Sequence, residues 1–490
     1  MTHFDIAVKG EPHWLSAARS LAAGISVPKV LPWLVCSSDA VAAGAAYFTA
    51  FDVAGDGSAP GEWLTTLVWP SVAVLTVMTC LAASGAYRWT RPLFEDAIER
   101  VRAPLVGTIA GSGLLIALQM CLGRAMSAES ALIYMAAAAV LVTAGRVIIQ
   151  LLSGAARHMG YDESRIFVVY PEGSAERYKS RLERLRAEGF TVCGIFQLGP
   201  QDCGGRGDEL TEICRTIADA AHKAKATEIL VCDGSIDARA AAILAHGLLP
   251  VAKVRIGSPL LAELARDARL AHDRLGDAAV LEFGSVAQAA SGRRLKKAFD
   301  YAFSIAALAV LAPLWALLAP VLVILQGRPV FFRQQRVNTG GGTFVFYKLR
   351  TMVNGLHRRS NGDLAKLNIL NGPMFKCPTD PRTTGVGRWL RRFSLDETPQ
   401  FYNVARGDIS VVGVRPPLPE EVEEYEPWHR ARLSGRMGIT GLWQVSGRSN
   451  RSFDEIVLLD MLYNSNCSIA GDIRIIWQTA SAVLSGRGAY

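Results

Sequence analysis

The 490-residue chain lacks the sequence patterns of several protein classes. Its nine cysteines are scattered and no two form a Cys-x-x-Cys pair. We therefore expect buried thiols in a reducing compartment, and neither a disulfide framework nor a zinc site. The basic residues are spread out without a nucleic-acid-binding motif, so no nucleic acid is expected as a partner. A clear cleavable signal peptide is also missing, because the first apolar stretch is long and lacks a small-x-small exit.

Apolar residues, in contrast, are abundant. Half of the chain is hydrophobic and the mean hydropathy is +0.21, which is high for a soluble protein. Lys and Arg exceed Asp and Glu, 52 against 44, which gives a net charge of +8. This excess suits an anionic lipid surface or an anionic substrate. The length predicts several domains.

Four long apolar stretches come first, each near the length of about 20 residues that crosses a bilayer as a helix. They are residues 30–51, 64–87, 105–125 and 131–152. The loop 52–62 has no Lys or Arg, whereas the loop 87–103 contains four arginines. The positive-inside rule then predicts that the N-terminus and everything after the fourth helix are cytoplasmic. Asp39 and Arg146 lie inside these stretches, where a charge is functional, faces a helix partner or sits near an interface.

Residues 165–283 have the pattern of an α/β module. The runs 166–170, 191–197, 228–232 and 251–256 read as buried strands, and 175–188 reads as a charged helix. This pattern is typical of a doubly wound, Rossmann-like fold. The turn after the first strand is Pro171-Glu172-Gly173-Ser174 and not Gly-x-Gly-x-x-Gly. The missing fingerprint favours a structural or regulatory module over a nucleotide site.

A further apolar run, 302–325, has basic residues on both sides. Pro313 lies near its middle and Pro320 follows. Because proline breaks the helical hydrogen-bond ladder, we predict a helix-break-helix that enters and leaves the same leaflet. The alternative is a fifth span, which would place the later segment with Asp396 and Glu397 on the opposite face of the membrane from the α/β module. Beyond the run, 345–349 reads as a strand, and the amphipathic segments 454–463 and 472–483 either lie on the membrane plane or pack on the core.

Two adjacent carboxylates, Asp396 and Glu397, stand among many fixed positive charges. The surrounding cations are Lys348, Arg350, Arg391, Arg392 and Arg415. Phosphate chemistry needs this combination, because it requires a metal ligand, an anionic nucleophile or base, and positive charge that neutralises the phosphates. A surface salt bridge is the alternative role for Arg391 and Arg392.

The strings from about Arg293 to the C-terminus resemble the bacterial sugar transferase family, the monotopic phosphoglycosyl transferases or polyprenyl-phosphate hexose-1-phosphate transferases. The strings are Tyr347-Lys348-Leu349-Arg350-Thr351-Met352, Ser394-Leu395-Asp396-Glu397-Thr398-Pro399-Gln400, Asn403-Val404, Gly407-Asp408, Gly413-Val414-Arg415-Pro416 and Gly438-Ile439-Thr440-Gly441-Leu442-Trp443-Gln444-Val445-Ser446-Gly447-Arg448. Each string is common by itself, whereas their order and spacing together are specific. The upstream spans and the α/β module resemble the long members of this family, which prime polysaccharide synthesis.

The resemblance implies a reaction. A UDP-sugar, with glucose and galactose both plausible, gives its sugar-1-phosphate to undecaprenyl phosphate or a related polyprenyl phosphate, and UMP leaves. Asp396 is implied as the nucleophile that forms a phosphosugar-aspartyl intermediate, and Glu397 as the ligand of Mg²⁺. The implied phosphate-binding residues are Lys348, Arg350, Arg391 and Arg415. Mg²⁺ and fixed cations reduce the repulsion between the carboxylate and the diphosphate.

Two residues depart from the family pattern. Val414 replaces the first proline of Pro-Arg-Pro, which removes a constraint on Arg415, and Ala312 replaces the serine of the Ser-Pro membrane break. Trp443, with the loop 438–448, is a candidate to hold the uridine or the sugar, and a structural glycine loop is the alternative. Two rival functions remain: a non-catalytic scaffold or regulator of polysaccharide assembly, and an enzyme in which Asp396 is a general base for direct attack by the lipid phosphate.

The predicted architecture is that of a multidomain protein of the bacterial inner membrane. It has a cytoplasmic N-terminus (1–29), a four-helix transmembrane bundle (30–155), a Rossmann-like α/β module (160–285), a re-entrant helix-break-helix (290–330) and a small α/β catalytic domain with amphipathic helices (331–490). The catalytic domain is expected on the cytoplasmic face. The exact lipid, the hexose and the oligomeric state, a homodimer included, stay open.

Overall fold

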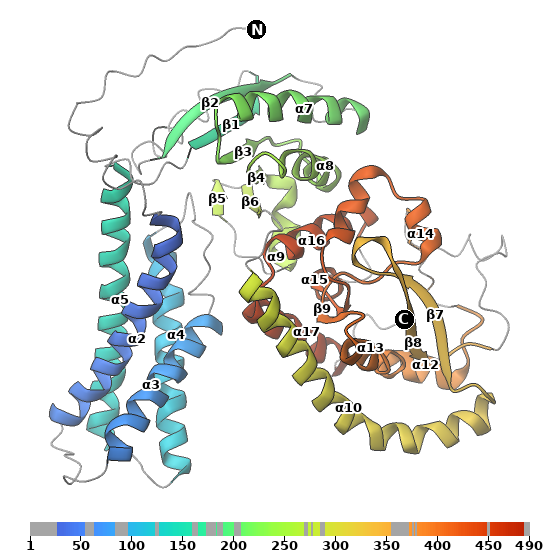
Figure 1. The fold of residues 1–490 in the computed structure, drawn as a ribbon, viewed down its shortest axis with the longest axis horizontal. Helices are drawn as coiled ribbons and strands as arrows, with labels where there is room; N and C mark the ends of the chain where they lie inside the picture. Colours follow the sequence, from blue (N-terminus) through green and yellow to red (C-terminus); the bar gives the residue numbers. More distant parts are fainter. Residues whose placement is uncertain are drawn as a thin grey trace. The chain divides into compact units, whose positions relative to one another are not determined.

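The structure is a computed structural model that divides into two compact units, residues 1–166 with 175–193 and residues 167–174 with 194–490 (Figure 1). It describes residues 27–53, 63–83, 97–122, 127–158, 165–172, 183, 190–199, 207–268, 273–275, 278–284, 290–353, 372–374, 377, 380–447 and 451–484.

Four helices make up most of the described part of the first unit. They are α2 (Val27–Val53), α3 (Trp63–Ala83), α4 (Ala97–Cys121) and α5 (Ala128–His158). The fully buried Ala46, Ala73 and Ala138 pack around Tyr47 and Tyr134, whose rings meet edge to face at 5.9 Å. Small residues let helix backbones approach closely, which favours helix association in lipid.

The two charges in the apolar stretches pair with each other. Arg146 on α5 donates to Asp39 on α2, from Nη2 at 2.6 Å and from Nε at 3.2 Å. The Asp39 side chain is fully buried. Of the options predicted for these residues, the structure therefore shows the helix partner, and the ion pair connects α2 to α5.

Three described segments are long and apolar enough to cross a membrane: Pro104–Cys121, Ala128–Ser153 and Arg294–Gln326. The described apolar parts of α2 and α3 are shorter, Leu34–Ala50 and Val68–Leu81. These lengths and compositions support a membrane protein, and the count of four spans stays a prediction. The loops that carry the predicted orientation, 52–62 and 87–103, lie mostly outside the described residues.

A six-stranded mixed sheet has the strand order β2-β1-β3-β4-β6-β5. Its strands are β1 (Arg165–Pro171), β2 (Thr191–Leu198), β3 (Glu228–Cys232), β4 (Lys253–Ser258), β5 (Asp273–Leu275) and β6 (Ala278–Phe283). The helices between them are α7 (Gly207–Lys223), α8 (Ala238–Leu248), η1 (Pro259–Leu261) and α9 (Ala262–Asp267). Strands β3 and β4 are parallel and joined by α8, whereas β6 is antiparallel to both β4 and β5.

The sheet agrees with the predicted α/β pattern at its first four strands, which begin within two residues of the predicted positions. Buried parallel strands are nearly continuous apolar runs, such as Ile229–Cys232 of β3, and are therefore easy to find in a sequence. The antiparallel pair β5 and β6 was not predicted, so the sheet is mixed and the doubly wound prediction holds only in part. The predicted helix 175–188 lies almost wholly outside the described residues.

The apolar run that was predicted to re-enter the membrane forms one long helix, α10 (Ala290–Gln326), which contains Pro313 and Pro320. Its ribbon is strongly curved (Figure 1). The predicted interruption is therefore wrong, because the chain stays helical through both prolines. Each proline removes one backbone hydrogen bond and clashes with a carbonyl of the preceding turn, which bends a helix without ending it when the neighbouring turns stay intact.

Both ends of α10 bind the same C-terminal domain. Near its start, Lys296 donates to Oδ2 of Asp472 at 2.7 Å. At its end, Arg350 donates to the backbone carbonyls of residues 326–328. A helix that spanned a bilayer would place its two ends on opposite sides. These contacts therefore favour the re-entrant form over a fifth span.

The rest of the domain consists of short elements. They are β7 (Phe331–Val337), η2 (Thr339–Gly341), β8 (Thr343–Leu349), α12 (Gly385–Arg392), η3 (Leu395–Glu397), α13 (Gln400–Arg406), β9 (Ser410–Val412), α14 (Pro419–Glu423), η4 (Pro427–Ser434), β10 (Gly438–Thr440), α15 (Leu442–Val445), α16 (Phe453–Ser465) and α17 (Ile469–Leu484). Strands β7 and β8 form an antiparallel hairpin, and β9 pairs with β10 in parallel.

The two amphipathic segments at the C-terminus have different surroundings. Helix α16 is buried at Phe453 and from Ile456 to Asn464, and it packs against α8 and η4, so its apolar residues belong to the core. Helix α17 keeps Ile473 and Trp477 on an exposed side, with Trp477 76% exposed. Of the two segments, α17 is therefore the one that presents an apolar face.

Candidate active site

The two adjacent acids lie on a short turn between two helices. The 3₁₀ helix η3 contains Asp396 and Glu397 and connects α12 to α13. Ser394, directly before it, has φ = +50°, which is uncommon for a residue other than glycine. Such a backbone persists only where the surrounding structure imposes it, and it often occurs at functional sites. Asp396 is buried, and Glu397 is partly exposed.

Two of the predicted cations contact one oxygen of Glu397. Nζ of Lys348 lies 2.8 Å from Oε1, and Nη1 of Arg415 lies 3.2 Å from the same atom. Lys348 lies on β8, two residues after Phe346 and hence on the same face of the hairpin. Its ammonium group also lies 5.5 Å from the centre of the Phe346 ring. The structure thus brings Lys348, Arg415 and Glu397 together as the sequence predicted.

The pKa values of the two acids shift in opposite directions. Burial raises the pKa of Asp396; Lys348 opposes this rise and the negative charge of Glu397 adds to it. Burial also acts to raise the pKa of Glu397, but Lys348 and Arg415 outweigh it and hold that pKa well below its usual range. Adjacent acids with separated pKa values can perform separate roles. Its two cations thus keep Glu397 ionised, whereas burial opposes the ionisation of Asp396.

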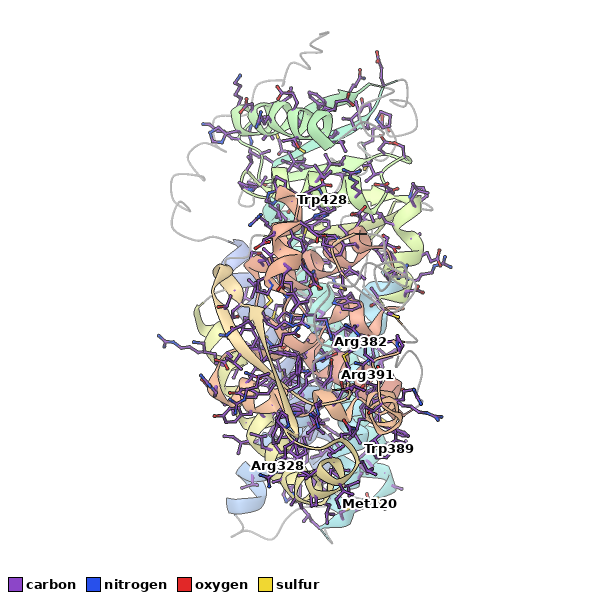
Figure 2. The ribbon with its side chains drawn as sticks, turned by 90° about the vertical axis from the view of Figure 1, so that its right-hand side faces the viewer. Met120, Arg328, Arg382, Trp389, Arg391 and Trp428 are labelled. Carbon is purple, nitrogen blue, oxygen red and sulfur yellow. The ribbon has the colours of Figure 1, made fainter. Side chains whose placement is uncertain are left out.

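Arg391 lies close to this pair, whereas the adjacent Arg392 is exposed. The Nε atom of Arg391 donates to Oγ1 of Thr351 at 3.1 Å, and its positive charge acts to lower the pKa of Asp396. Arg392 is exposed and lies over the ring of Phe393 at 5.8 Å. Arg391 is labelled in Figure 2.

Arg350 was predicted to bind phosphate, but its described contacts are of another kind. Its guanidinium group is buried and donates to the backbone carbonyls of Gln326, Gly327 and Arg328, the last of which is labelled in Figure 2. The final carbonyls of a helix have no partner within the helix, and a basic side chain can satisfy them. Arg350 therefore anchors the end of α10.

Arg336 belongs to the site although the sequence suggested only a flank of the membrane segment. Its Nη1 donates to the carbonyl of Pro416 at 2.8 Å, next to Arg415. Burial lowers the pKa of Arg336 to about 10, with Arg415 adding to the effect and Glu421 and Glu397 opposing it. The strand alternation of β7 is the only sequence signal that could have separated Arg336 from the other basic residues after α10.

Hydrogen bonds hold the segment before Arg415 in place of the missing proline. The N–H of Val414 donates to the carbonyl of Arg436 at 2.8 Å, and the carbonyl of Val414 accepts from Gly438 at 2.7 Å. A side chain at Gly413 would meet the Arg436 carbonyl oxygen at 2.3 Å. Glycine at position 413 therefore permits the close approach of the two paired segments, 413–414 and 436–438. The hydrogen bonds between these segments constrain the backbone before Arg415, as a proline would.

The hydrogen bonds of Asn403 give a structural role to two of the family strings, Asn403-Val404 and Gly407-Asp408. Its Nδ2 donates to the carbonyl of Val345 at 2.7 Å and to Oδ2 of Asp408 at 2.9 Å. Its Oδ1 accepts from the N–H of Tyr347 at 3.2 Å. These bonds hold α13 against β8, the strand of Lys348. The Asn403 and Asp408 motifs thus fix the distance between Lys348 and the Asp-Glu turn.

Trp443 is buried at 7% exposure on α15. This burial favours the structural alternative for the loop 438–448, whose last residue lies outside the described part of the chain.

The acids fit a magnesium ion that is completed by substrate. Among the described residues, no group of three or more His, Cys, Asp or Glu could hold a metal by itself. Mg²⁺ is usually bound through one or two carboxylates together with substrate phosphates, so an adjacent pair of acids is sufficient. Lys348 and Arg415 both contact Oε1 of Glu397.

Comparison with known proteins places this site in a family. Residues 291–486 match the family described as bacterial sugar transferase. The exopolysaccharide production protein ExoY of Sinorhizobium fredii is 37% identical over 204 residues, which are 40% of this chain and 88% of ExoY. The chain belongs to the bacterial sugar transferase family. The predicted resemblance is thereby confirmed.

Two other relatives match over a smaller share of their own length. The galactosyl transferase CpsE of Streptococcus agalactiae is 49% identical over 164 residues, 33% of this chain and 36% of CpsE. The undecaprenyl-phosphate galactose phosphotransferase of Salmonella typhimurium is 39% identical over 208 residues, 41% of this chain and 42% of that protein. The chain thus matches less than half of the length of these two relatives.

Proposed function

We propose that this protein transfers a hexose-1-phosphate from a UDP-sugar to undecaprenyl phosphate or a related polyprenyl phosphate, and so starts the synthesis of a bacterial polysaccharide. The observation that carries the proposal is the turn that holds Asp396 and Glu397, with Lys348 and Arg415 in contact with Glu397. Membership of the bacterial sugar transferase family and the names of the relatives support it.

In the first step, a carboxylate oxygen of Asp396 attacks the β-phosphorus of the UDP-sugar. The bond from this phosphorus to the bridging oxygen breaks, and the electron pair leaves with UMP. In the second step, an oxygen of the lipid phosphate attacks the same phosphorus and releases the Asp396 carboxylate. A covalent intermediate lets two bulky substrates use one site in turn.

The fixed cations have a defined task in both steps. A carboxylate and a diphosphate repel each other, so positive charge must offset this repulsion before they can react. Arg415 and Lys348 already lie at the turn, and Arg336 holds the segment that carries Arg415. Arginine suits bidentate contact with phosphate oxygens, whereas lysine acts as a point charge.

Glu397 would hold Mg²⁺ together with the substrate phosphates. The metal would supply Lewis-acid stabilisation of charge on the phosphates. Glu397 suits this role because its low pKa keeps it ionised. UMP release should therefore stop when EDTA removes divalent cations and return when Mg²⁺ is added.

The site faces the cytoplasm in this proposal, and α10 enters and leaves the inner leaflet of the inner membrane. Both ends of α10 bind the catalytic domain, which supports a re-entrant helix. The basic residues that flank the apolar run suit the cytoplasmic side. A cysteine placed near Arg336 should react with a membrane-impermeant reagent from that side alone.

The test of the proposed mechanism is the fate of Asp396. Asp396→Asn keeps the shape of the side chain and removes the nucleophile, so UMP release should fall about 10³-fold or more. The wild-type enzyme, given a UDP-sugar without lipid acceptor, should carry a sugar-phosphate adduct on the Asp396 peptide. Full activity of the Asn variant would exclude the nucleophile. Absence of an adduct, together with dependence on Asp396, would favour direct attack by the lipid phosphate.

The hexose is glucose or galactose in this proposal, and these sugars differ in the orientation of one hydroxyl group. UMP release measured against a panel of UDP-sugars identifies the donor. We expect UDP-galactose or UDP-glucose to give the highest kcat/KM. If the enzyme turned over neither UDP-galactose nor UDP-glucose, the proposed donor would be contradicted.

A further inference from the structure

We infer that the membrane helix α10 positions the catalytic turn, with Trp315 as the positioning residue. This inference rests on the proposed function. Its central contact is a hydrogen bond in which the indole Nε1 of Trp315 donates to Oγ1 of Thr398 at 3.0 Å. Thr398 directly follows Glu397, and Trp315 lies two residues after Pro313.

The hydrogen bond continues into the turn that holds the acids. The hydroxyl of Thr398 accepts from Trp315 and donates to the carbonyl of Leu395 at 2.7 Å. Leu395 is the first residue of η3, and the N–H of Thr398 donates to the same carbonyl at 3.3 Å. Because a hydroxyl that both donates and accepts has a fixed orientation, the indole holds both ends of the turn in one arrangement.

Apolar packing also connects the part of α10 after Pro313 to the turn, independently of the Trp315 hydrogen bond. Leu322 of α10 is buried with Leu349 of β8 and Leu390 of α12, and Leu395 packs against this cluster. Leu349 directly follows Lys348, and Leu390 directly precedes Arg391. The part of α10 after Pro313 therefore packs against the segments that carry the two acids and two of the surrounding cations, Lys348 and Arg391.

The chemistry of the surroundings explains why the indole matters. An indole N–H in an apolar helix needs an acceptor, because an unsatisfied donor in a lipid environment is costly. Thr398 supplies that acceptor from the catalytic domain. The turn also contains Ser394 at φ = +50°, a conformation that its surroundings must maintain. We therefore assign to Trp315 the maintenance of the turn, with no contact to substrate.

The test uses the full chain in lipid and substitutions that remove the hydrogen-bond donor or the acceptor. Trp315→Phe keeps an aromatic ring against Phe331, which Trp315 meets edge to face at 6.3 Å, and removes the donor. Thr398→Val removes the acceptor, and Thr398→Ser retains it. We expect Trp315→Phe and Thr398→Val each to lower kcat about fivefold to tenfold, as for one lost hydrogen bond, with KM for the UDP-sugar changed less than about twofold. Thr398→Ser should keep the wild-type kcat.

The matched control is Trp428→Phe, which also removes an indole donor. Trp428 donates to Glu426 at 2.9 Å in the same domain, and it is labelled in Figure 2. This variant should keep the wild-type kcat. In the double variant of Trp315 and Thr398, the loss should equal that of one single variant, because both substitutions remove the same bond.

Amide hydrogen exchange of the peptide 393–400 separates this inference from the proposed function. Trp315→Phe should speed exchange in this peptide about tenfold, and Trp428→Phe should not. An inactive wild type with this difference in exchange would contradict the proposed function and leave the positioning role in place. Wild-type kcat and wild-type exchange in Trp315→Phe would overturn the inference.

Discussion

Arg391 and Arg392 are adjacent residues with different effects on the proposed nucleophile. Arg391 acts to lower the pKa of Asp396, whereas Arg392 is exposed and contacts the ring of Phe393. Since attack requires the Asp396 carboxylate, its ionisation sets the acid limb of the rate profile. Burial raises this pKa, so the limb should lie above the ordinary value of about 3.9 for an aspartate.

Substitution of these arginines tests the assignment. Removal of a nearby cation destabilises the carboxylate and raises its pKa further, so a higher pH is needed to ionise it. Arg391→Met should therefore move the acid limb of kcat/KM to higher pH. Arg392→Met, which removes the same charge one residue later, should leave the limb in place. Profiles of UMP release against pH measure both, and equal limbs in the two variants would contradict the role of Arg391.

The residues of the site could be predicted where a local motif carries them. Lys348, Glu397 and Arg415 were predicted from their strings, and the structure brings them together. Arg350 is two residues after Lys348, which in a continuing strand would place both on one face. Strand β8 ends at Leu349, so this alternation stops and Arg350 binds the end of α10 instead. Its partners lie more than twenty residues away and have no signal in the sequence.

At the level of secondary structure, α10 and β9 are joined by the carboxylate of Asp300. Its Oδ2 accepts from Oγ of Ser410 at 2.7 Å, and its Oδ1 accepts from the N–H of Val411 at 3.1 Å. Strand β9 ends at Val412, and the chain leads on through Val414 to Arg415, whose guanidinium group contacts Glu397. The part of α10 before Pro313 thus supports β9, the strand that precedes Arg415.

Loss of Asp300 should weaken both stability and catalysis. Asp300→Ala leaves the buried N–H of Val411 without its partner, which should lower the free energy of unfolding by about 1–3 kcal/mol. We expect a lower unfolding temperature and a lower kcat, because Arg415 is held less firmly. Ser410→Ala removes one hydrogen bond and keeps the carboxylate, so its effect should be smaller. Thermal unfolding and UMP release measure the two effects, and an Asp300→Ala variant like the wild type would refute the role.

The α16 segment shows why its surroundings could not be predicted from periodicity. Asp460 gives the sequence a polar position typical of an exposed face, yet it is buried. Its carboxylate accepts from Nε of Arg432 at 2.9 Å, and the same guanidinium donates to the hydroxyl of Tyr425 at 2.8 Å. Burial raises the pKa of Asp460 to about 6, against the effect of Arg432. A polar residue can lie in a core when a distant residue pairs with it.

In the second unit as a whole, the α/β module packs on the catalytic domain through α8 and α16. Polar contacts accompany this packing: Arg451 pairs with Asp267, and Asn466 donates to the carbonyl of Glu282 at 2.9 Å. The residues of the proposed site all follow residue 290 and lie within residues 291–486, which match the bacterial sugar transferase family. The catalytic domain should therefore be active without the α/β module, but it should be less stable without it.

A chain that begins at residue 285 tests this separation. It keeps α10 and the proposed site, so UMP release per folded molecule should stay within about tenfold of the full chain. The truncated chain also exposes the face of α16 that packs on α8 in the full chain. Because burial of apolar area contributes about 25 cal/mol per Å² to stability, the unfolding temperature of the truncated chain should fall clearly. The control is Arg239→Ala in the full chain, which removes only an exposed pair with Glu426 and should change stability by less than about 1 kcal/mol. A folded but inactive truncated chain would show that the module takes part in catalysis, because the loss could not then be assigned to stability.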